Sequence, residues 1–341
     1  MKFGPHPVAE AEGAVLAHSV ALTSGRLRKG LVLTRGHLAD LAAEGLDDVI
    51  VARLEPGDVG EDAAARRVAE ALVPDPSAAR LRITKAFTGR VNLIAEVPGV
   101  VRLDTDRLNA LNEIDPMLTL ATVPDLQHMA EGGMVATVKI IAYAVPGAAV
   151  EQAEALLGDA RGGAIGLAIP VMCNARLIVT EIPGGAGDKG VQAIENRLRA
   201  LGMTLTEVLK VPHREEAIRK ALAAPDATDL TLILTGSATS DPYDVAPEAV
   251  RRAGGEVSRF GMPVDPGNLL FIGDLAGRPV IGLPGCARSP ALNGADWVLS
   301  RVVCGIGVSA SDIAAMGVGG LLKEIPTRPQ PRAGRKRAGS E

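Results

Sequence analysis

The segment LILTGSATSDPYD, residues 232–244, runs from an apolar strand into a loop crowded with hydroxyl and carboxylate groups. Gly236 lets the backbone turn tightly and lets a ligand approach it, and the helix expected next points its positive end at a bound anion. Asp244 has the opposite charge, so it suits the N–H groups of a ligand or a cation beside a phosphate. Equally, Asp241 or Asp244 can be the N-cap of that helix. The polar residues of the loop are Thr235, Ser237, Thr239, Ser240, Asp241 and Asp244.

A second loop of this kind, LPGCARSP, occupies residues 283–290. Arg288 could hold a phosphate through two hydrogen bonds, or it could be an ordinary surface arginine. Cys286 as a nucleophile would need a base, and His213 is the only histidine in this half of the chain. The local sequence places His213 at the end of another strand, which does not favour cysteine catalysis. The candidate residues of this loop are Pro284, Gly285, Cys286, Arg288 and Ser289.

Two further polar loops follow apolar runs. TEIPGGAGD contains the acids Glu181 and Asp188, and VDPGN contains Pro266 and Gly267. Ligands of open α/β sheets bind outside the carboxyl ends of the strands, so we expect these loops to share one edge. We also expect Gly236→Val to abolish binding and spare the fold, because a Cβ atom would block the ligand.

Strands and helices alternate from about residue 175 onward. The runs RLIVTEI, LTEVLKVP and LTLILTG predict strands, and GDKGVQAIENRLRALG, HREEAIRKALAA and VAPEAVRRAGG predict helices between and after them. LLFIGDLAGRPVIGLPG predicts an antiparallel hairpin that turns at Ala276-Gly277. The expected fold class is therefore α/β, with a three-layer, mostly parallel sheet preceded by smaller α+β and β-rich domains.

Changes of composition divide the chain into four expected parts. Residues 1–75 predict a small α+β region, residues 76–172 a β-rich scaffold and residues 173–325 the α/β domain, with VPDPSAAR, residues 73–80, as a linker. Residues 326–341 predict a disordered basic tail, either an arm that binds nucleic acid or simply a linker or loose end.

The composition limits the classes of function. The chain has 341 residues, 2% aromatic side chains and a net charge of −4, so it lacks the basic field of a nucleic-acid-binding protein. Cys173, Cys286 and Cys304 show neither zinc nor disulfide spacing. No signal-peptide pattern or apolar run of about 18 residues is found. We expect a soluble cytoplasmic protein without nucleic-acid or membrane partners.

The loops and their order resemble the molybdopterin-binding domain of molybdenum-cofactor biosynthesis proteins, a family that includes the bacterial molybdopterin molybdotransferases and gephyrin. The resemblance covers residues 175–307 and rests on LILTGSATSDPYD and on MPVDPGNLLFIGDLAGRPVIGLPGCARS. It implies that the matching positions hold the pterin and its phosphate, and that the acidic position, Asp244, assists metal insertion and binds Mg²⁺. Glu181, a candidate acid in a loop that departs from the family motif, is expected as a second catalytic carboxylate. With the loop chemistry added, the expected binding residues are Thr235, Gly236, Ser237, Thr239, Ser240, Asp244, Pro266, Gly267, Pro284, Gly285, Cys286, Arg288 and Ser289.

Departures from the family pattern shift the expected role. The two lysines that flank Pro-Gly in the family are Asp265 and Asn268 here, and its Asn-Pro is Cys286-Ala287. A site with less positive charge holds molybdate less well, so we expect molybdopterin binding by a carrier, or by a partner of a cofactor-finishing enzyme.

Two alternatives remain open. One is an active Mg²⁺-dependent molybdotransferase that inserts molybdate, and the other is a nucleotide-processing enzyme with a related domain. A similar divergent domain is fused to a cytidylyltransferase in other proteins, which makes that enzyme a candidate partner and the tail a candidate linker. Related domains form dimers or trimers, so we expect a homo-oligomer.

Overall fold

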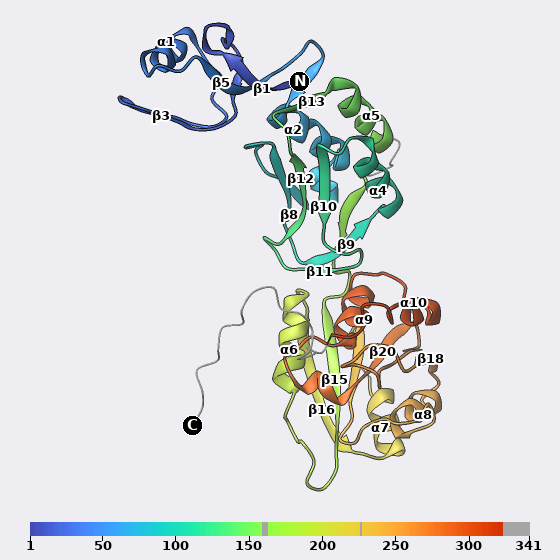
Figure 1. Cartoon of the computed structure of the whole chain (residues 1–341). Helices are drawn as coiled ribbons and strands as arrows, with labels where there is room; N and C mark the ends of the chain where they lie inside the picture. Colours follow the sequence, from blue (N-terminus) through green and yellow to red (C-terminus); the bar gives the residue numbers. More distant parts are fainter. Residues whose placement is uncertain (159–162, 226, 323–341) are drawn as a thin grey trace, which may run out of the picture. The chain divides into compact units, whose positions relative to one another are not determined.

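The structure is a computed structural model that describes residues 1–158, 163–225 and 227–322 (Figure 1). The chain forms two compact units, unit 1 (Met1–Ile169) and unit 2 (Pro170–Glu341). The expected basic tail, residues 326–341, lies outside the described residues. None of the helices in the described ranges is long and apolar enough to cross a membrane.

Unit 1 begins with a small antiparallel sheet in the order β1-β5-β2. Side chains alternate between the faces of β5, so Val49 and Val51 pack with Leu38 and Leu41 of helix α1 in a small core. A two-stranded hairpin, β3–β4, lies between β2 and α1 along the chain. The elements are β1 (Lys2–Pro7), η1 (Val8–Glu10), β2 (Val15–Leu16), β3 (Val20–Leu22), β4 (Gly25–Leu27), α1 (Arg35–Ala43) and β5 (Asp48–Arg53).

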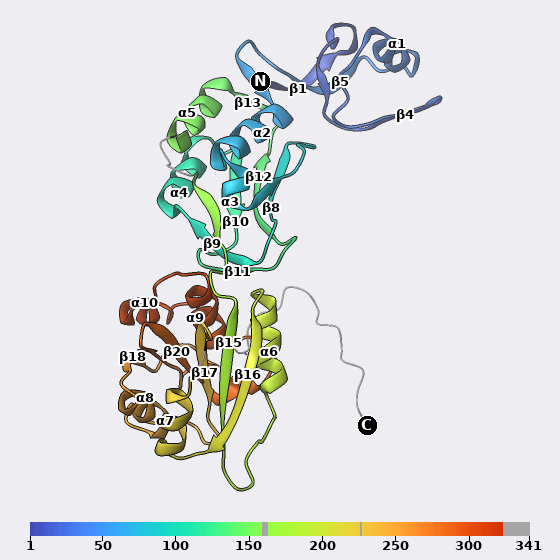
Figure 2. The ribbon, with the colours of Figure 1, turned by 180° about the vertical axis from the view of Figure 1, so that it is seen from behind.

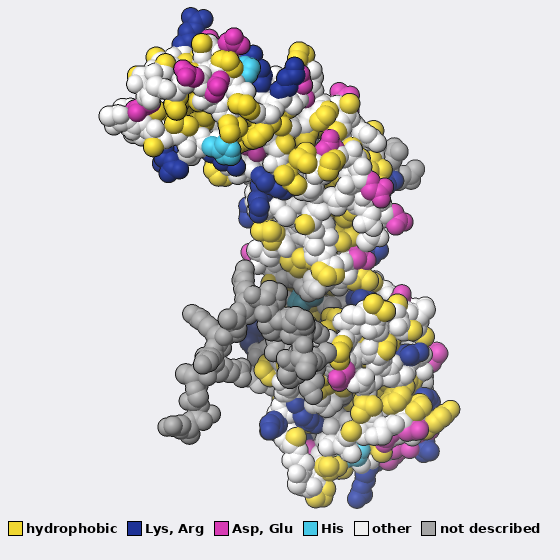
Figure 3. Space-filling model, in the orientation of Figure 1, with side chains coloured by type: hydrophobic (Ala, Val, Ile, Leu, Met, Phe, Trp, Pro, Cys, Tyr) yellow, Lys and Arg dark blue, Asp and Glu magenta, His cyan; other side chains and the backbone are white. Residues whose placement is uncertain are grey.

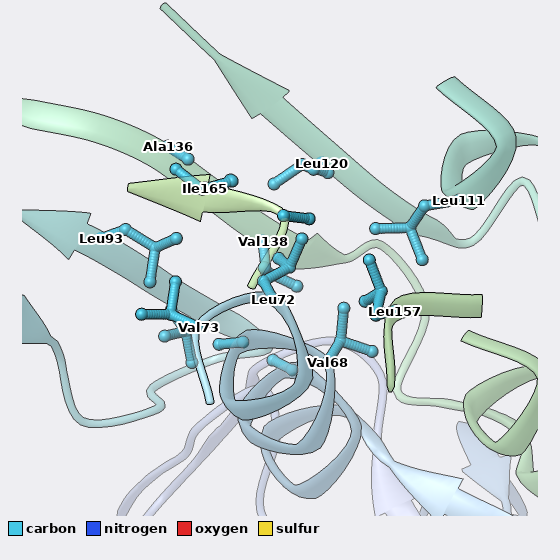
Figure 4. Close-up of a cluster of buried hydrophobic side chains, with 14 of the residues drawn as sticks. Val68, Leu72, Val73, Leu93, Leu111, Leu120, Ala136, Val138, Leu157 and Ile165 are labelled. Carbon is cyan, nitrogen blue, oxygen red and sulfur yellow. The ribbon is translucent and has the colours of Figure 1, made fainter. Parts of the chain in front are cut away.

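The rest of unit 1 packs helices on two further sheets, β10-β12-β8-β7 and β11-β9-β14, and a ribbon, β13-β6. Figure 4 shows Val68 and Leu72 of α2 among Leu93, Val138 and Leu157, all of which are buried. The elements are β6 (Asp58–Gly60), α2 (Glu61–Leu72), α3 (Pro76–Ala79), β7 (Leu81–Ile83), β8 (Arg90–Ala95), β9 (Gly99–Leu103), α4 (Thr105–Ile114), β10 (Leu118–Thr122), β11 (His128–Met129), β12 (Met134–Ile140), β13 (Ala144–Pro146), α5 (Gly147–Gly158) and β14 (Ile165–Ala168).

The stretch 73–80, expected as a linker, is part of this core. It contains helix α3, and both Val73 and Ala79 are buried. The Asp75 side chain accepts a hydrogen bond from the Ala78 backbone N–H at 2.9 Å and so caps the helix, with Pro76 at its first position. The Pro and Asp residues that suggested a linker therefore start a short helix.

Some large apolar side chains of unit 1 face solvent. Phe3, Val32, Phe87 and Ile141 are each more than half exposed. The ring of Phe3 stacks on Tyr143 with ring centroids 6.5 Å apart. Figure 3 shows such apolar side chains spread over one face of the unit rather than gathered at one place, as is normal for protein surfaces.

Unit 2 is built on one six-stranded sheet in the order β16-β15-β17-β20-β19-β18. The first four strands are parallel, and β19 is antiparallel to both of its neighbours. The hairpin turn at Ala276-Gly277 is confirmed, with φ of 55° and 79° at the two residues. The strands are β15 (Asn174–Glu181), β16 (Thr204–Pro212), β17 (Leu230–Leu234), β18 (Glu256–Phe260), β19 (Phe271–Leu275) and β20 (Arg278–Leu283).

Helices cover both faces of this sheet (Figures 1 and 2). Leu177 of β15 packs in one cluster with Leu198 of α6 and Val298 of α9. The next residue, Ile178, packs on the other face with Ile218 of α7. The α/β class is therefore confirmed. The helices are α6 (Val191–Ala200), α7 (Glu215–Ala223), α8 (Val245–Arg252), η2 (Gly285–Arg288), α9 (Gly294–Val303) and α10 (Ala310–Ala315).

Candidate functional site

The four predicted loops lie at one edge of the unit 2 sheet, as the sequence predicts: three follow β15, β17 and β20, and the fourth joins Phe260 to Phe271, which pairs with Gly282 near the end of β20. In the parallel strands β15, β17 and β20, Val179 pairs with Leu234, and Leu234 pairs with Leu283. The turn at Gly236 and the turn at Pro284 therefore start side by side, as the sequence predicts. The loop after β15 starts beside them and protrudes from the lower end of unit 2 in Figure 1.

Thr180 connects the ends of three strands. Its buried Oγ1 accepts a hydrogen bond of 2.7 Å from the Gly236 backbone N–H and lies 2.8 Å from Nδ1 of His213. The backbone N–H of His213 donates to the carbonyl oxygen of Glu181 at 3.0 Å. One hydroxyl group thus fixes the ends of β15, β16 and β17 to one another.

Sequence reasoning missed both Thr180 and His213. His213 was weighed only as a base for Cys286, whereas the structure pairs it with Thr180. The available signal was positional: Thr180 lies at the carboxyl end of one predicted strand and His213 directly follows another, and parallel strands bring such ends together.

The fold leaves no room for a side chain at Gly236. A Cβ atom at this position would lie 2.6 Å from the carbonyl oxygen of Thr180, which is backbone and cannot move aside easily. The expectation that Gly236→Val would spare the fold is therefore wrong. The glycine lets two backbone segments approach each other, a requirement that local sequence does not reveal.

Asp244 uses both carboxylate oxygens on backbone groups. Oδ1 accepts from the Val245 N–H at 2.7 Å and Oδ2 from the Ser240 N–H at 2.9 Å, so Asp244 is the N-cap of α8. The Asp244 carboxylate is thus occupied by the backbone of the loop and of the helix start. Within the described ranges, there is no group of three or more His, Cys, Asp or Glu side chains that could hold a metal ion.

The other hydroxyl residues of this loop differ in exposure. Thr235 and Thr239 are buried, and their Oγ1 atoms lie 3.3 Å apart. Ser237 and Ser240 are exposed. The two threonines therefore shape the loop from inside, whereas the two serines face solvent and are free to meet a ligand.

Arg288 joins all three loops. Its Nη1 donates to the carbonyl oxygen of Lys189 and its Nη2 to that of Thr235, each at 2.7 Å. Burial lowers the pKa of this guanidinium, which nevertheless stays cationic because arginine titrates far above neutral pH. The residue predicted to clamp a phosphate thus also ties the loops together.

The fourth loop packs against the start of α9. The Gly294 N–H donates to the carbonyl oxygen of Pro266 at 2.9 Å, and a Cβ at Gly267 would lie 2.6 Å from the Gly294 nitrogen. The Pro266-Gly267 turn is therefore held against the start of α9. Burial raises the pKa of the Cys286 thiol, and the negative charge of Asp265 raises it further.

Backbone N–H groups and exposed polar side chains also lie at this edge. Among the described residues, the backbone N–H groups of Ser237, Ala238, Thr239 and Gly285 donate to no protein acceptor. Glu181 and Ser289 are exposed, and Asp188 pairs with Nζ of Lys210 at 2.5 Å. The edge therefore offers unused amide donors together with a carboxylate.

A cavity of about 490 Å³ lies elsewhere, in unit 1. Among the residues that the structure describes, it is lined by small residues such as Ala78 and Ala164, with Arg102 and Asp104 as the charged ones. Asp104 already caps α4 through the Arg107 N–H at 3.2 Å. The open edge of unit 2, which carries the reactive groups, is the better candidate site.

Residues 174–303 match the family model described as "Probable molybdopterin binding domain". A second model, for a domain of unknown function (DUF8806), matches residues 5–53. The comparison with curated proteins found no match.

Three solved structures are similar to this chain. The molybdopterin biosynthesis MoeA protein from Pyrococcus horikoshii is 14% identical over 89% of this chain and 75% of its own, with a TM-score of 0.32. Molybdenum cofactor biosynthesis protein B is 16% identical over 39% of this chain and 88% of its own, with a TM-score of 0.27. A molybdopterin biosynthesis protein from Mycobacterium abscessus is 18% identical over 40% of this chain and 94% of its own, with a TM-score of 0.29.

The matched segment contains β15, β17 and β20 and the three loops that Arg288 and Thr180 hold together. Residues 174–303, which carry these loops, are thus the part of the chain that matches the family model of probable molybdopterin-binding domains.

Proposed function

We propose that unit 2 binds molybdopterin at the edge formed by the carboxyl ends of β15, β17 and β20. The protein would serve molybdenum-cofactor biosynthesis as a carrier, or as a partner of an enzyme that finishes the cofactor. The main support is that the family match falls on the three loops joined by Arg288, whose guanidinium contacts Lys189 and Thr235.

Unused donors at this edge suit the phosphate of the ligand. The N–H groups of Ser237, Ala238, Thr239 and Gly285 have no protein acceptor within the described residues, and successive backbone N–H groups in a turn form concavities that bind anions. The charge of Arg288 attracts the same group. The exposed carboxylate of Glu181 would accept hydrogen bonds from the N–H groups of the pterin.

Binding without molybdate insertion is the form of the proposal that the side chains support best. A catalytic role for Asp244 would require it to give up the N–H groups of Val245 and Ser240. Asp265 and Asn268 stand where the family pattern has lysines, which lowers the positive charge available to an oxyanion. The proposal therefore includes no resident Mg²⁺.

A carrier needs an acceptor for its ligand. We expect a cytidylyltransferase or another enzyme of cofactor biosynthesis in this role, in the cytoplasm, with this protein as a dimer or trimer. Sedimentation of the purified chain tests the oligomeric state. Transfer of pterin from the loaded protein to a purified cytidylyltransferase, measured with and without physical contact through a dialysis membrane, tests the partner.

Co-purification tests the function itself. The chain is purified from a bacterial host that makes molybdopterin and from one that cannot, and the fluorescence of oxidised pterin is measured per mole of protein. We expect near-stoichiometric pterin from the first host and none from the second. Sustained release of AMP from adenylylated molybdopterin on addition of molybdate would instead establish insertion. Tight binding of ADP-ribose without pterin would favour nucleotide processing.

A further inference from the structure

The guanidinium group of Arg197 is largely shielded from solvent. The residue lies on α6, and its side chain is 11% exposed. A buried guanidinium must have its donors satisfied, because an unpaired buried charge is strongly destabilising. Its contacts are Asp296 Oδ1 at 2.6 Å from Nε, the carbonyl oxygens of Ala287 at 2.9 Å and Ala193 at 3.3 Å from Nη1, and those of Ser289 at 2.8 Å and Ala291 at 2.9 Å from Nη2.

Three of these acceptors belong to one segment, residues 284–291. This segment follows β20 and has only a short turn, η2, as regular structure. Alternate carbonyl groups along it, from Ala287 to Ala291, converge on the single guanidinium. Without Arg197, these three carbonyls would lose their common donor, and the segment would be held by the buried Ala287, its own turn hydrogen bonds and the contacts of Arg288 alone.

The same guanidinium reaches the start of α9. Asp296 accepts a hydrogen bond from Nε of Arg197 through Oδ1 and one of 2.8 Å from the backbone N–H of Asn293 through Oδ2. The second bond completes a capping box at the start of α9. The two arginines of the region thus have complementary contacts. Arg197 holds residues 284–291 to α6 and α9, and from that segment Arg288 reaches the other two loops.

We propose that Arg197 is a positioning residue of the binding edge. It does not touch the ligand. It sets the path of residues 284–291, so that the Gly285 N–H and the Arg288 guanidinium are in place before the ligand arrives. This inference rests on the proposed function, because it concerns the affinity of the same site.

The chemistry of the contacts requires arginine. A planar guanidinium presents five donors in a rigid fork, whereas a lysine ammonium is a compact charge that cannot bridge several carbonyls in one plane. Arg199, two residues further along α6, gives a matched control, since its side chain is 65% exposed and pairs with Glu195.

The experiment compares Arg197→Lys, Arg197→Met and Arg199→Met in the full chain. The first readout is alkylation of Cys286 by iodoacetamide, followed by mass spectrometry with the exposed Cys173 as internal reference. Burial is the main cause of the raised pKa of Cys286, whereas the charge of Arg197 lowers that pKa. The Arg197→Lys variant keeps a positive charge, so in it release of the segment should increase alkylation of Cys286 about threefold or more relative to Cys173, and Arg197→Met should show a smaller increase. The second readout is the affinity for molybdopterin released from a molybdoenzyme, which we expect to fall about tenfold in both Arg197 variants. Arg199→Met should change neither.

The two readouts separate the two proposals. If wild-type protein binds no pterin while Cys286 is released in the Arg197 variants, the proposed function fails and the structural contact stands. If the wild-type protein binds pterin, and both Arg197 variants bind it with the wild-type affinity at temperatures where they are folded, the positioning role is refuted. Full rescue by lysine would show that charge alone suffices, which also refutes it. If neither variant folds, Arg197 is a core residue, and the proposal is likewise overturned.

Discussion

Nη2 of Arg288 donates a hydrogen bond of 2.7 Å to the carbonyl oxygen of Thr235, 53 residues away in the sequence. Both residues were expected in a ligand site, and the contact joins them without any ligand. A charged side chain that already holds a backbone carbonyl still contributes its positive charge to the edge. We therefore expect Arg288 to affect binding in two ways, through the shape of the loops and through its charge.

Replacing Arg288 separates these two effects. Arg288→Ala removes both carbonyl contacts, so we expect the free energy of unfolding of unit 2 to fall by about 2 kcal/mol and molybdopterin affinity to weaken more at low salt than at high salt. Arg288→Lys keeps the charge but cannot bridge Lys189 and Thr235, so it should lose stability and keep most of the salt dependence. Denaturant titration and fluorescence binding at two ionic strengths measure both quantities. An affinity that ignores salt in wild type and in Arg288→Ala would exclude the charge effect.

Replacement of glycine by alanine should lower the stability of the protein at Gly236 and leave it unchanged at Gly285. Gly236→Ala places a Cβ 2.6 Å from the Thr180 carbonyl oxygen, so we expect the free energy of unfolding to fall by about 1–3 kcal/mol. A Cβ at Gly285 meets no atom within 4 Å, so Gly285→Ala should leave stability within about 0.5 kcal/mol of wild type. Thermal unfolding compares them directly.

The ligand readout for these glycines is also specific. If the phosphate approaches the free Gly285 N–H, the methyl group of Gly285→Ala lies beside it and affinity should fall while the fold is intact. Unchanged affinity in Gly285→Ala would move the ligand away from this loop. Equal stability of Gly236→Ala and wild type would contradict the close approach to Thr180.

Local pattern predicted the elements of unit 2 well. Alternating apolar runs and amphipathic segments gave the strands and helices, because burial on a parallel sheet imposes those periods directly. An i,i+4 spacing of opposite charges favours a pair, and Glu195 and Arg199 make one at 2.7 Å. Glu215 and Arg219 have the same spacing, but Arg219 contacts Glu216 and Glu215 contacts Arg252 of α8. Even a helix-surface pair can thus be redirected by a neighbouring helix.

The connections within the site could not be predicted from spacing. Arg288 and Lys189 are 99 residues apart, and Arg197 and Ser289 are 92 apart. Their partners are backbone carbonyls, which every residue carries, so no side-chain pattern marks them. Motif reasoning therefore predicted that these loops lie together but assigned Arg288 and Gly236 to the ligand, whereas the structure shows both in contacts between the loops.

Asp244 should behave first as a helix cap. Asp244→Ala leaves the N–H groups of Val245 and Ser240 without their acceptor, so we expect a loss of about 1 kcal/mol in the free energy of unfolding. Its matched control is Asp104→Ala, which removes the N-cap of α4 in unit 1. Both should lower stability by similar amounts, and only Asp244→Ala should weaken pterin binding, because it alone disturbs the loop after β17. Equal binding in the two variants would remove Asp244 from the site.

The Cys286 thiol reports on the edge through its pH dependence. Burial raises its pKa, so at pH 8 less thiolate is present than in an exposed cysteine, and alkylation should reach half its maximal rate above the usual value of about 8.5. A thiol whose folded pKa is raised adds stability below the unfolded pKa, and that stability is lost as pH rises through the folded pKa. Cys286→Ser should therefore reduce the loss of stability of unit 2 as pH rises above about 8.5. Exposed Cys173 and buried Cys304 set the fast and slow limits of alkylation. Bound molybdopterin should slow Cys286 alone, and equal slowing of Cys173 would point to a general effect rather than to occupation of this edge.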